Sequence, residues 1–127
     1  MTHEQTWDVV RRYHEAWTTA KDFDAASRLL AERLETDLPV NTYVDKREFV
    51  KAIRGFGESV SSVRLLSACA GPHPGEALMI YDLVLDGIGT LRIAEQFKVA
   101  EGRITFIRQV HDTATMRAAG FAPALSL

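Results

Sequence analysis

The stretch TLRIAEQFKVAEGRITFIRQVHD, residues 90–112, decides the fold. In its first half, apolar and polar side chains alternate with a period of two, which is the pattern of a strand with one buried face. Ala100, Glu101 and Gly102 then form a turn signal, so the second half is expected to fold back as an antiparallel neighbour. Glu95 falls on the apolar side of the first strand, together with Leu91, Ile93, Phe97 and Val99.

Two further strands are predicted before this pair. The segments SVSSVRLLSACA, residues 59–70, and EALMIYDLVLD, residues 76–86, are rich in period-two or β-branched runs. The turn-forming sequences GPHPG, residues 71–75, and DGIG, residues 86–89, follow them. Four consecutive strands joined by short turns predict an antiparallel meander.

Helices are predicted in the N-terminal half, over residues 7–20, 25–31 and 45–57. Asp24 is expected to cap the second helix and Asp45 the third, because their side chains can accept from free backbone N–H groups. Pro39 cannot continue a helix, so residues 34–39 are expected to be extended. Helices followed by a meander indicate an α+β fold in a single domain, residues 1–127, with three N-terminal helices on one face of a curved, mainly antiparallel sheet.

Composition and charge exclude several classes of function. Fifteen Lys and Arg against 17 Asp and Glu give a net charge of −2, and the basic residues are scattered singly, so no nucleic-acid partner is expected. No apolar run approaches the roughly 20 residues of a membrane span. The N-terminal sequence has no signal-peptide pattern, so we expect a cytoplasmic protein without a membrane partner.

Cysteine and histidine positions give no support for a metal or another cofactor. Cys69 is the only cysteine and is expected to be a small buried side chain on a strand. His3, His14 and His73 fall at a terminus, on a polar helix flank and in a turn, where solvated roles are expected. We therefore expect no metal site and no cofactor.

Parity alone does not decide which face of the last strand points inward. Ile104, Phe106 and Val110 compete with a second set made of Ile107, Gln109 and His111. A β-bulge after Ile104 would let both sets contribute to the interior.

Several short segments together carry a family resemblance. They are VVRRY at 9–13, DFD at 22–24, LLA at 29–31, PV at 39–40, EQFKV at 95–99 and GRI at 102–104. With them, nearly the whole chain resembles the nuclear transport factor 2-like superfamily, and within it the SnoaL-like and ketosteroid-isomerase-like branches. The resemblance implies a cone-shaped barrel of helices and sheet that is open at one end, takes a small-molecule ligand and forms a homodimer through the sheet.

The resemblance also assigns roles to individual residues. Tyr13 stands at the position of the oxyanion-hole tyrosine of ketosteroid isomerases, and Glu95 at that of their protonated aspartic acid. The isomerase base directly precedes the proline, where this chain has Leu38, which cannot move a proton. Asp37 lies one residue earlier and points to the opposite side by strand parity. The same alignment turns Ile107, Gln109 and His111 inward.

The candidate site therefore joins catalytic groups to an aromatic wall. The expected catalytic residues are Glu95, His111 and Tyr13, with Glu95 and His111 approaching each other across neighbouring strands. His111 and Asp112 are adjacent on a strand, so they point to opposite faces and do not form a dyad. The pocket is expected to include Trp17, Leu38, Tyr43, Phe49, Ile53, Phe56, Tyr81, Phe97, Ile107 and Gln109.

Three functional hypotheses follow from this arrangement. The first is a cofactor-independent lyase, isomerase, cyclase or hydrolase that uses general acid–base chemistry on a small apolar or polycyclic compound. The second is a non-catalytic ligand-binding module in which the same polar groups only orient the ligand. The third is a dimeric scaffold whose pocket is vestigial. The interior carboxylate Glu95 fits either catalysis or the satisfaction of a polar core.

Overall fold

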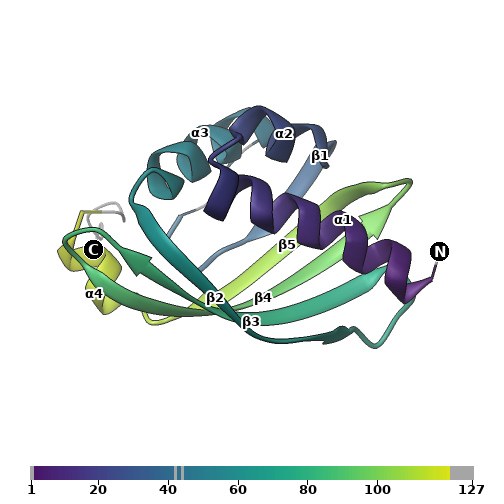
Figure 1. The fold of residues 1–127 in the computed structure, drawn as a ribbon. Coiled ribbons are helices and arrows are strands. Elements are labelled where there is room, and N and C mark those ends of the chain that lie inside the picture. Colours follow the sequence, from purple (N-terminus) through teal and green to yellow (C-terminus); the bar gives the residue numbers. More distant parts are fainter. Residues whose placement is uncertain (1, 42, 44, 121–127) are drawn as a thin grey trace.

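The computed structural model describes residues 2–41, 43 and 45–120. Within them the chain forms helices and five strands in one layered arrangement (Figure 1). In chain order the elements are α1 His3–Glu15, the π-helix η1 Ala16–Ala20, α2 Phe23–Arg28, β1 Leu30–Asp37, α3 Lys46–Gly57, β2 Val60–Ala70, β3 Glu76–Leu85, β4 Gly89–Ala100, β5 Arg103–His111 and α4 Ala114–Ala118.

The first helix begins with a capping box and ends in a π-helical turn. The Thr2 side chain accepts from the backbone N–H of Gln5, and the Gln5 side chain accepts from the backbone N–H of Thr2. The expected single α-helix over 7–20 instead changes at Ala16 to η1. There the Thr18 hydroxyl donates to the carbonyl of His14 at 2.6 Å. π-Helical turns of this kind are frequent at functional sites.

The second helix is shorter than its periodicity indicates. Asp22, and not Asp24, is its N-cap, because the Asp22 carboxylate accepts from the backbone N–H of Ala25 at 3.0 Å. The helix ends at Arg28, and Leu30 already belongs to strand β1. The prediction of helix through residue 31 was wrong, because pairing with Ile104 and complete burial of Leu30 override the local helical pattern.

The sheet has the strand order β1-β5-β4-β3-β2. The four predicted strands pair antiparallel, and the predicted extended segment is the fifth strand, β1, which runs parallel to β5. Helices α1, α2 and α3 cover one face of this curved sheet, and α4 lies near one end of it (Figure 1). The molecule is thus an α+β structure with helices on a five-stranded mixed sheet.

A bulge resolves the ambiguity of the last strand. Lys98 pairs with Phe106 while Val99 pairs with Ile104, which leaves Thr105 as the extra residue on β5. Ile104 and Ile107 are both completely buried as a result. A bulge after Ile104, one of the possibilities that the sequence left open, is therefore present, although Val110 of the first set remains exposed.

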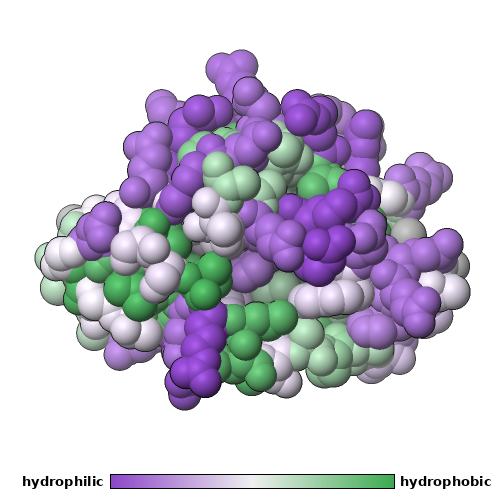
Figure 2. Space-filling view, in the orientation of Figure 1, coloured by the Kyte–Doolittle hydropathy of each residue, from purple (hydrophilic) through white to green (hydrophobic). Residues whose placement is uncertain are grey.

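The outer face of the sheet remains largely uncovered within the described chain. Large apolar side chains are exposed on it, and Figure 2 shows apolar surface in the lower half of the view, over the strands, below the mostly hydrophilic helices. Cys69 on β2 is also exposed, so its expected burial was wrong: the helices cover only the other face. Ile80, Val84 and Val110 are the exposed large apolar residues of this face. Leu65 and Leu66 on the edge strand β2 are also exposed, and Leu65 pairs with the buried Tyr81.

Candidate functional site

A cavity of about 710 Å³ lies between the helices and the inner face of the sheet. Helix α3 supplies one wall, β4 and β5 another, and Met116 of α4 a third. Eight residues of the predicted site line this cavity: Trp17, Leu38, Tyr43, Phe49, Ile53, Phe56, Gln109 and His111.

Aromatic rings form much of the apolar wall. The Trp17 ring is 1% exposed and tilted against Phe56, with 6.0 Å between the ring centroids. Tyr43 meets Phe49 edge to face at 5.8 Å. Such a wall favours a flat, largely apolar ligand, since ring faces and edges offer van der Waals contact over a wide area.

Five predicted site residues lie in the closed interior beside the cavity, outside its lining. Tyr81, Phe97 and Ile107 are completely buried in the core. Tyr13 is also buried and packs edge to face against Phe97, with 6.0 Å between centroids. Glu95 lies on the inner face and is 2% exposed.

Glu95 is the centre of the polar interior. Its Oε1 accepts from the Tyr81 hydroxyl at 2.7 Å, and its Oε2 accepts from the Gln109 amide nitrogen at 2.8 Å. Burial raises the pKa of Glu95 from 4.5 to about 7, while the two hydrogen bonds act in the opposite direction because they favour the carboxylate. A carboxyl group with this pKa exchanges protons readily near neutral pH.

The two buried tyrosines stay neutral around this carboxyl group. Burial raises the pKa of Tyr13 well above its ordinary value, and the charge of Glu95 adds to that effect. Burial also raises the pKa of Tyr81, with further contributions from the charge and hydrogen bond of Glu95. Both phenols can therefore donate hydrogen bonds and do not act as bases near neutrality.

His111 on β5 is offset by two residues from the position that pairs with Glu95 on β4. It pairs with Ile93 on β4, whereas Glu95 pairs with Gln109. The His111 ring is half-buried, lines the cavity, and has Nδ1 3.0 Å from the carbonyl oxygen of Asp112. The two hydrogen bonds of Glu95 thus run to Tyr81 and Gln109, while His111 faces the cavity as its diagonal neighbour.

Asp37 and Asp112, the two aspartates near the site, have interaction partners outside the cavity. Asp37 forms an ion pair with Arg108, with 2.7 Å between Oδ2 and Nε, and both side chains are exposed. Strand parity had turned Asp37 away from the site, and this ion pair agrees with that direction. The Asp112 carboxylate accepts from the backbone N–H of Ala114 at the start of α4.

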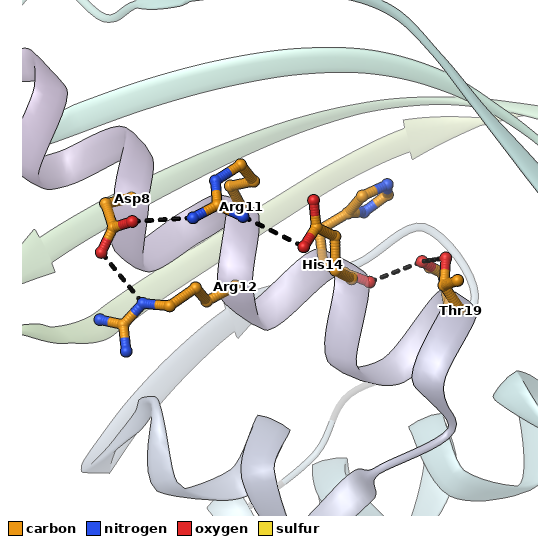
Figure 3. Close-up of polar contacts among 7 residues, drawn as sticks. Asp8, Arg11, Arg12, His14 and Thr19 are labelled. Atoms are coloured by element: carbon orange, nitrogen blue, oxygen red, sulfur yellow. Dashed lines mark hydrogen bonds and ion pairs between the residues drawn. The ribbon is translucent and has the colours of Figure 1, made fainter.

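His14 is the polar residue that the sequence placed wrongly. It is only 6% exposed and meets the Tyr81 ring edge to face, with 4.5 Å between centroids, so it is not a solvated flank residue. Figure 3 shows its ring directed toward the strands. Neither ring nitrogen has a hydrogen-bond partner, and burial lowers the pKa of His14 to about 4. The spacing of Val10, His14 and Trp17 on one helix face was a signal that could have located it.

Sequence reasoning also missed the polar residues that line the cavity on α3 and before it. Asn41, Glu48 and Lys51 contribute there. Among residues 2–41, 43 and 45–120, no group of three or more His, Cys, Asp or Glu side chains could hold a metal ion. None of the helices in this part of the chain is long and apolar enough to cross a membrane.

Comparison with solved structures places the fold. A protein from Kribbella flavida DSM 17836 is similar over 89% of this chain and 91% of its own, with 28% identity and a TM-score of 0.80. A nuclear transport factor 2-like protein of unknown function from Cytophaga hutchinsonii ATCC 33406 is similar over 88% and 94%, with 17% identity and a TM-score of 0.72. An LEH-like epoxide hydrolase from M. tuberculosis is similar over 91% and 88%, with 19% identity and a TM-score of 0.70.

Sequence comparisons add no assignment to this structural likeness. No protein-family model matches the chain, and no curated protein matches it. The expected fold is nevertheless confirmed: the chain has the fold of the nuclear transport factor 2-like superfamily. One fold supports many chemistries, so function has to be argued from the cavity.

Proposed function

We propose that this chain, with its nuclear transport factor 2-like fold, binds a small, largely apolar molecule and acts on it by cofactor-independent general acid–base catalysis. The observation that carries the proposal is the buried Glu95 carboxyl group, which is hydrogen-bonded to the cavity-lining Gln109. Isomerisation, elimination, cyclisation and hydrolysis are the reaction classes that one such proton-exchanging centre can serve.

The residues divide the work according to their places. His111 and Gln109 line the cavity and would contact the ligand, so His111 can exchange a proton with it and Gln109 can orient a polar group. Glu95, which accepts a hydrogen bond from Gln109, would supply the titrating carboxyl group. Tyr81 would stabilise the negative charge of Glu95 through its hydrogen bond, while the buried Tyr13 stays neutral. Trp17, Phe56 and Phe49 would hold the apolar part of the ligand.

Replacement of Glu95 by Gln tests this proposal. Glutamine keeps the size and hydrogen-bonding capacity of the side chain but cannot exchange a proton near neutral pH. With the first substrate from a screen of aromatic and polycyclic ketones, epoxides and hydroxy compounds, we expect turnover to fall by about 100-fold or more. Ligand affinity should change by only a few fold. Retained turnover in Glu95→Gln would remove Glu95 from catalysis and transfer the acid–base role to His111.

A ligand-binding module without catalysis is the second candidate. It is favoured by the complete pairing of Glu95, since both carboxyl oxygens already accept hydrogen bonds. In this case the wild type would bind compounds from the screen without converting any of them. The Glu95→Gln substitution would then change mainly the free energy of unfolding.

We also propose that two copies of the chain pair through the outer face of the sheet. Ile80, Ala94 and Val110 form one row across β3, β4 and β5, and the first and last of them are 42% and 64% exposed. An uncovered apolar row on a broad sheet face suits a self-complementary interface.

A further inference from the structure

Gln109 connects the buried carboxyl group to the cavity. Its amide nitrogen donates to Glu95 Oε2 at 2.8 Å, and its side chain also lines the cavity. Within the described part of the chain, Gln109 is the residue that both lines this cavity and is hydrogen-bonded to Glu95. The primary amide of Gln109 therefore lies between the carboxyl group of Glu95 and the cavity.

The charge of Glu95 dictates how that amide is oriented. An ionised carboxylate only accepts hydrogen bonds, so it holds the NH₂ end of Gln109 and leaves the carbonyl Oε1 for the cavity. A neutral carboxylic acid has one O–H donor, which seeks an acceptor. Tyr81 continues to donate to Oε1 of Glu95, so the acid proton on Oε2 can be satisfied by the Gln109 carbonyl after a rotation of the amide. The NH₂ end then faces the cavity.

We propose that the charge of Glu95 sets which end of the Gln109 amide faces the cavity, so that the carboxylate favours a ligand hydroxyl and the neutral acid favours a ligand carbonyl. This inference rests on the proposed function only in that the cavity takes a flat apolar ligand. The ligand class is therefore a flat hydrocarbon skeleton with one oxygen function at the Gln109 wall. Binding of a ketone takes up a proton above the pKa of Glu95, and binding of the matching alcohol does not.

The tyrosine and histidine side chains of α1 and β3 near Glu95 stay neutral near pH 7, so the ionisation of Glu95 is the change that reorients the Gln109 amide. Tyr13 from α1 and Tyr81 from β3 have pKa values raised well above the ordinary one, so both remain neutral. His14 from α1 lies behind Tyr81 and has a pKa of about 4, so it is neutral near pH 7. His111 from β5 is the other titratable side chain on this wall, and a His111 variant tests its contribution. Glu48 and Lys51 line the same cavity from α3, and Glu95→Gln and Gln109→Leu separate their effect from that of Glu95.

Fluorenone and fluorenol are the test ligands, because they share one flat skeleton and differ at a single oxygen. Their dissociation constants should be measured for the full chain between about pH 6 and about pH 8, on either side of the Glu95 pKa of about 7. We expect the ketone to weaken relative to the alcohol by about tenfold over this range, because only the neutral fraction presents the NH₂ end. In Glu95→Gln and in Gln109→Leu the ratio of the two constants should not change with pH.

Three outcomes of this titration would overturn the inference. A ratio that stays constant with pH in the wild type is one, and failure of both compounds to bind is another. A pH dependence that disappears in His111→Gln is the third, since it would assign the effect to that imidazole. The titration measures binding and not turnover. Failure of the catalytic proposal would therefore leave the titration result valid, and failure of this inference would leave the catalytic proposal open to its own test.

A second measurement needs no ligand. The side-chain NH₂ resonances of Gln109 should shift with the ionisation of Glu95 in the wild type and stay constant in Glu95→Gln. The Gln96 amide is the matched control, because its carbonyl accepts from Arg108 on the outer face, away from the carboxyl group. Gln109 signals that do not titrate in the wild type would also overturn the inference.

Discussion

The phenol of Tyr81 and the carboxyl group of Glu95 form a 2.7 Å hydrogen bond in the closed interior of the molecule. The two residues are diagonal neighbours on β3 and β4, because Tyr81 pairs with Ile93 and Glu95 pairs with Met79. This contact and the one to Gln109 allow a carboxylate to exist where burial alone would favour the neutral acid.

The Tyr81→Phe substitution should therefore raise the pKa of Glu95 above its present value of about 7. Phenylalanine keeps the ring packing but removes the hydroxyl that stabilises the carboxylate. We expect the free energy of unfolding to fall by about 1 to 3 kcal/mol near neutral pH, since Oε1 loses its buried donor. Carbon-detected NMR titration of Glu95 measures the pKa. Tyr43→Phe, in the cavity wall, is the control and should leave that pKa unchanged.

Glu95 should make the protein less stable as the pH rises. Its pKa is 4.5 in an ordinary environment and about 7 in the folded chain, so the folded state binds the extra proton between these values. The stabilisation is complete below about pH 4.5 and is lost as the pH rises through about 7, to a total of roughly 3 kcal/mol. Urea unfolding over this range should show that slope in the difference between the wild type and Glu95→Gln. A difference that is constant with pH would contradict the raised pKa.

His14 should have the opposite dependence. Burial lowers its pKa from 6.5 to about 4, so the unfolded chain binds the extra proton between these values. The stability that depends on neutral His14 is complete above about pH 6.5 and is lost as the pH falls through about 4, by roughly 3 kcal/mol. We expect His14→Phe to lose less stability on acidification than the wild type. Between about pH 4.5 and 6.5, Glu95 and His14 change the free energy of unfolding with pH in opposite directions. A variant that removes one of them should therefore show the pH dependence of the other. Equal acid slopes for His14→Phe and wild type would exclude a buried neutral imidazole.

The sequence correctly predicted that Glu95 lies on the inner face of the sheet, because strand parity is a strong constraint. A one-residue shift of β4 would bring Arg92 and Lys98 into the core, so the alternation allowed one register. The bulge on β5 was predictable for a related reason: Ile104 and Ile107 have opposite parity, and both are apolar enough to require burial.

Other parts of the site depended on long-range contacts that local patterns do not contain. Strand β1 begins at Leu30 because β5 pairs with β1 from that residue onward. No local pattern within β1 indicates that it has a parallel neighbour. Helix α4 is five residues long and has no periodic pattern, yet its Met116 closes one side of the cavity. Glu95 and Tyr81 could each be placed inside, but their hydrogen bond depends on the relative register of β3 and β4.

The last prediction concerns the outer face of the sheet, where we expect wild-type protein to sediment as a homodimer at micromolar concentration. Val110 is 64% exposed in the row shared with Ala94 and Ile80, so a dimer would remove apolar surface from water there. Val110→Lys places a charge in that row and should shift the equilibrium to monomer, because a desolvated, unpaired ammonium group is costly. Thr19→Lys adds the same charge at an exposed position on the helical side and should leave the dimer intact. Sedimentation of the wild type as a monomer, or an unchanged dimer in Val110→Lys, would show that this face does not join two copies of the chain.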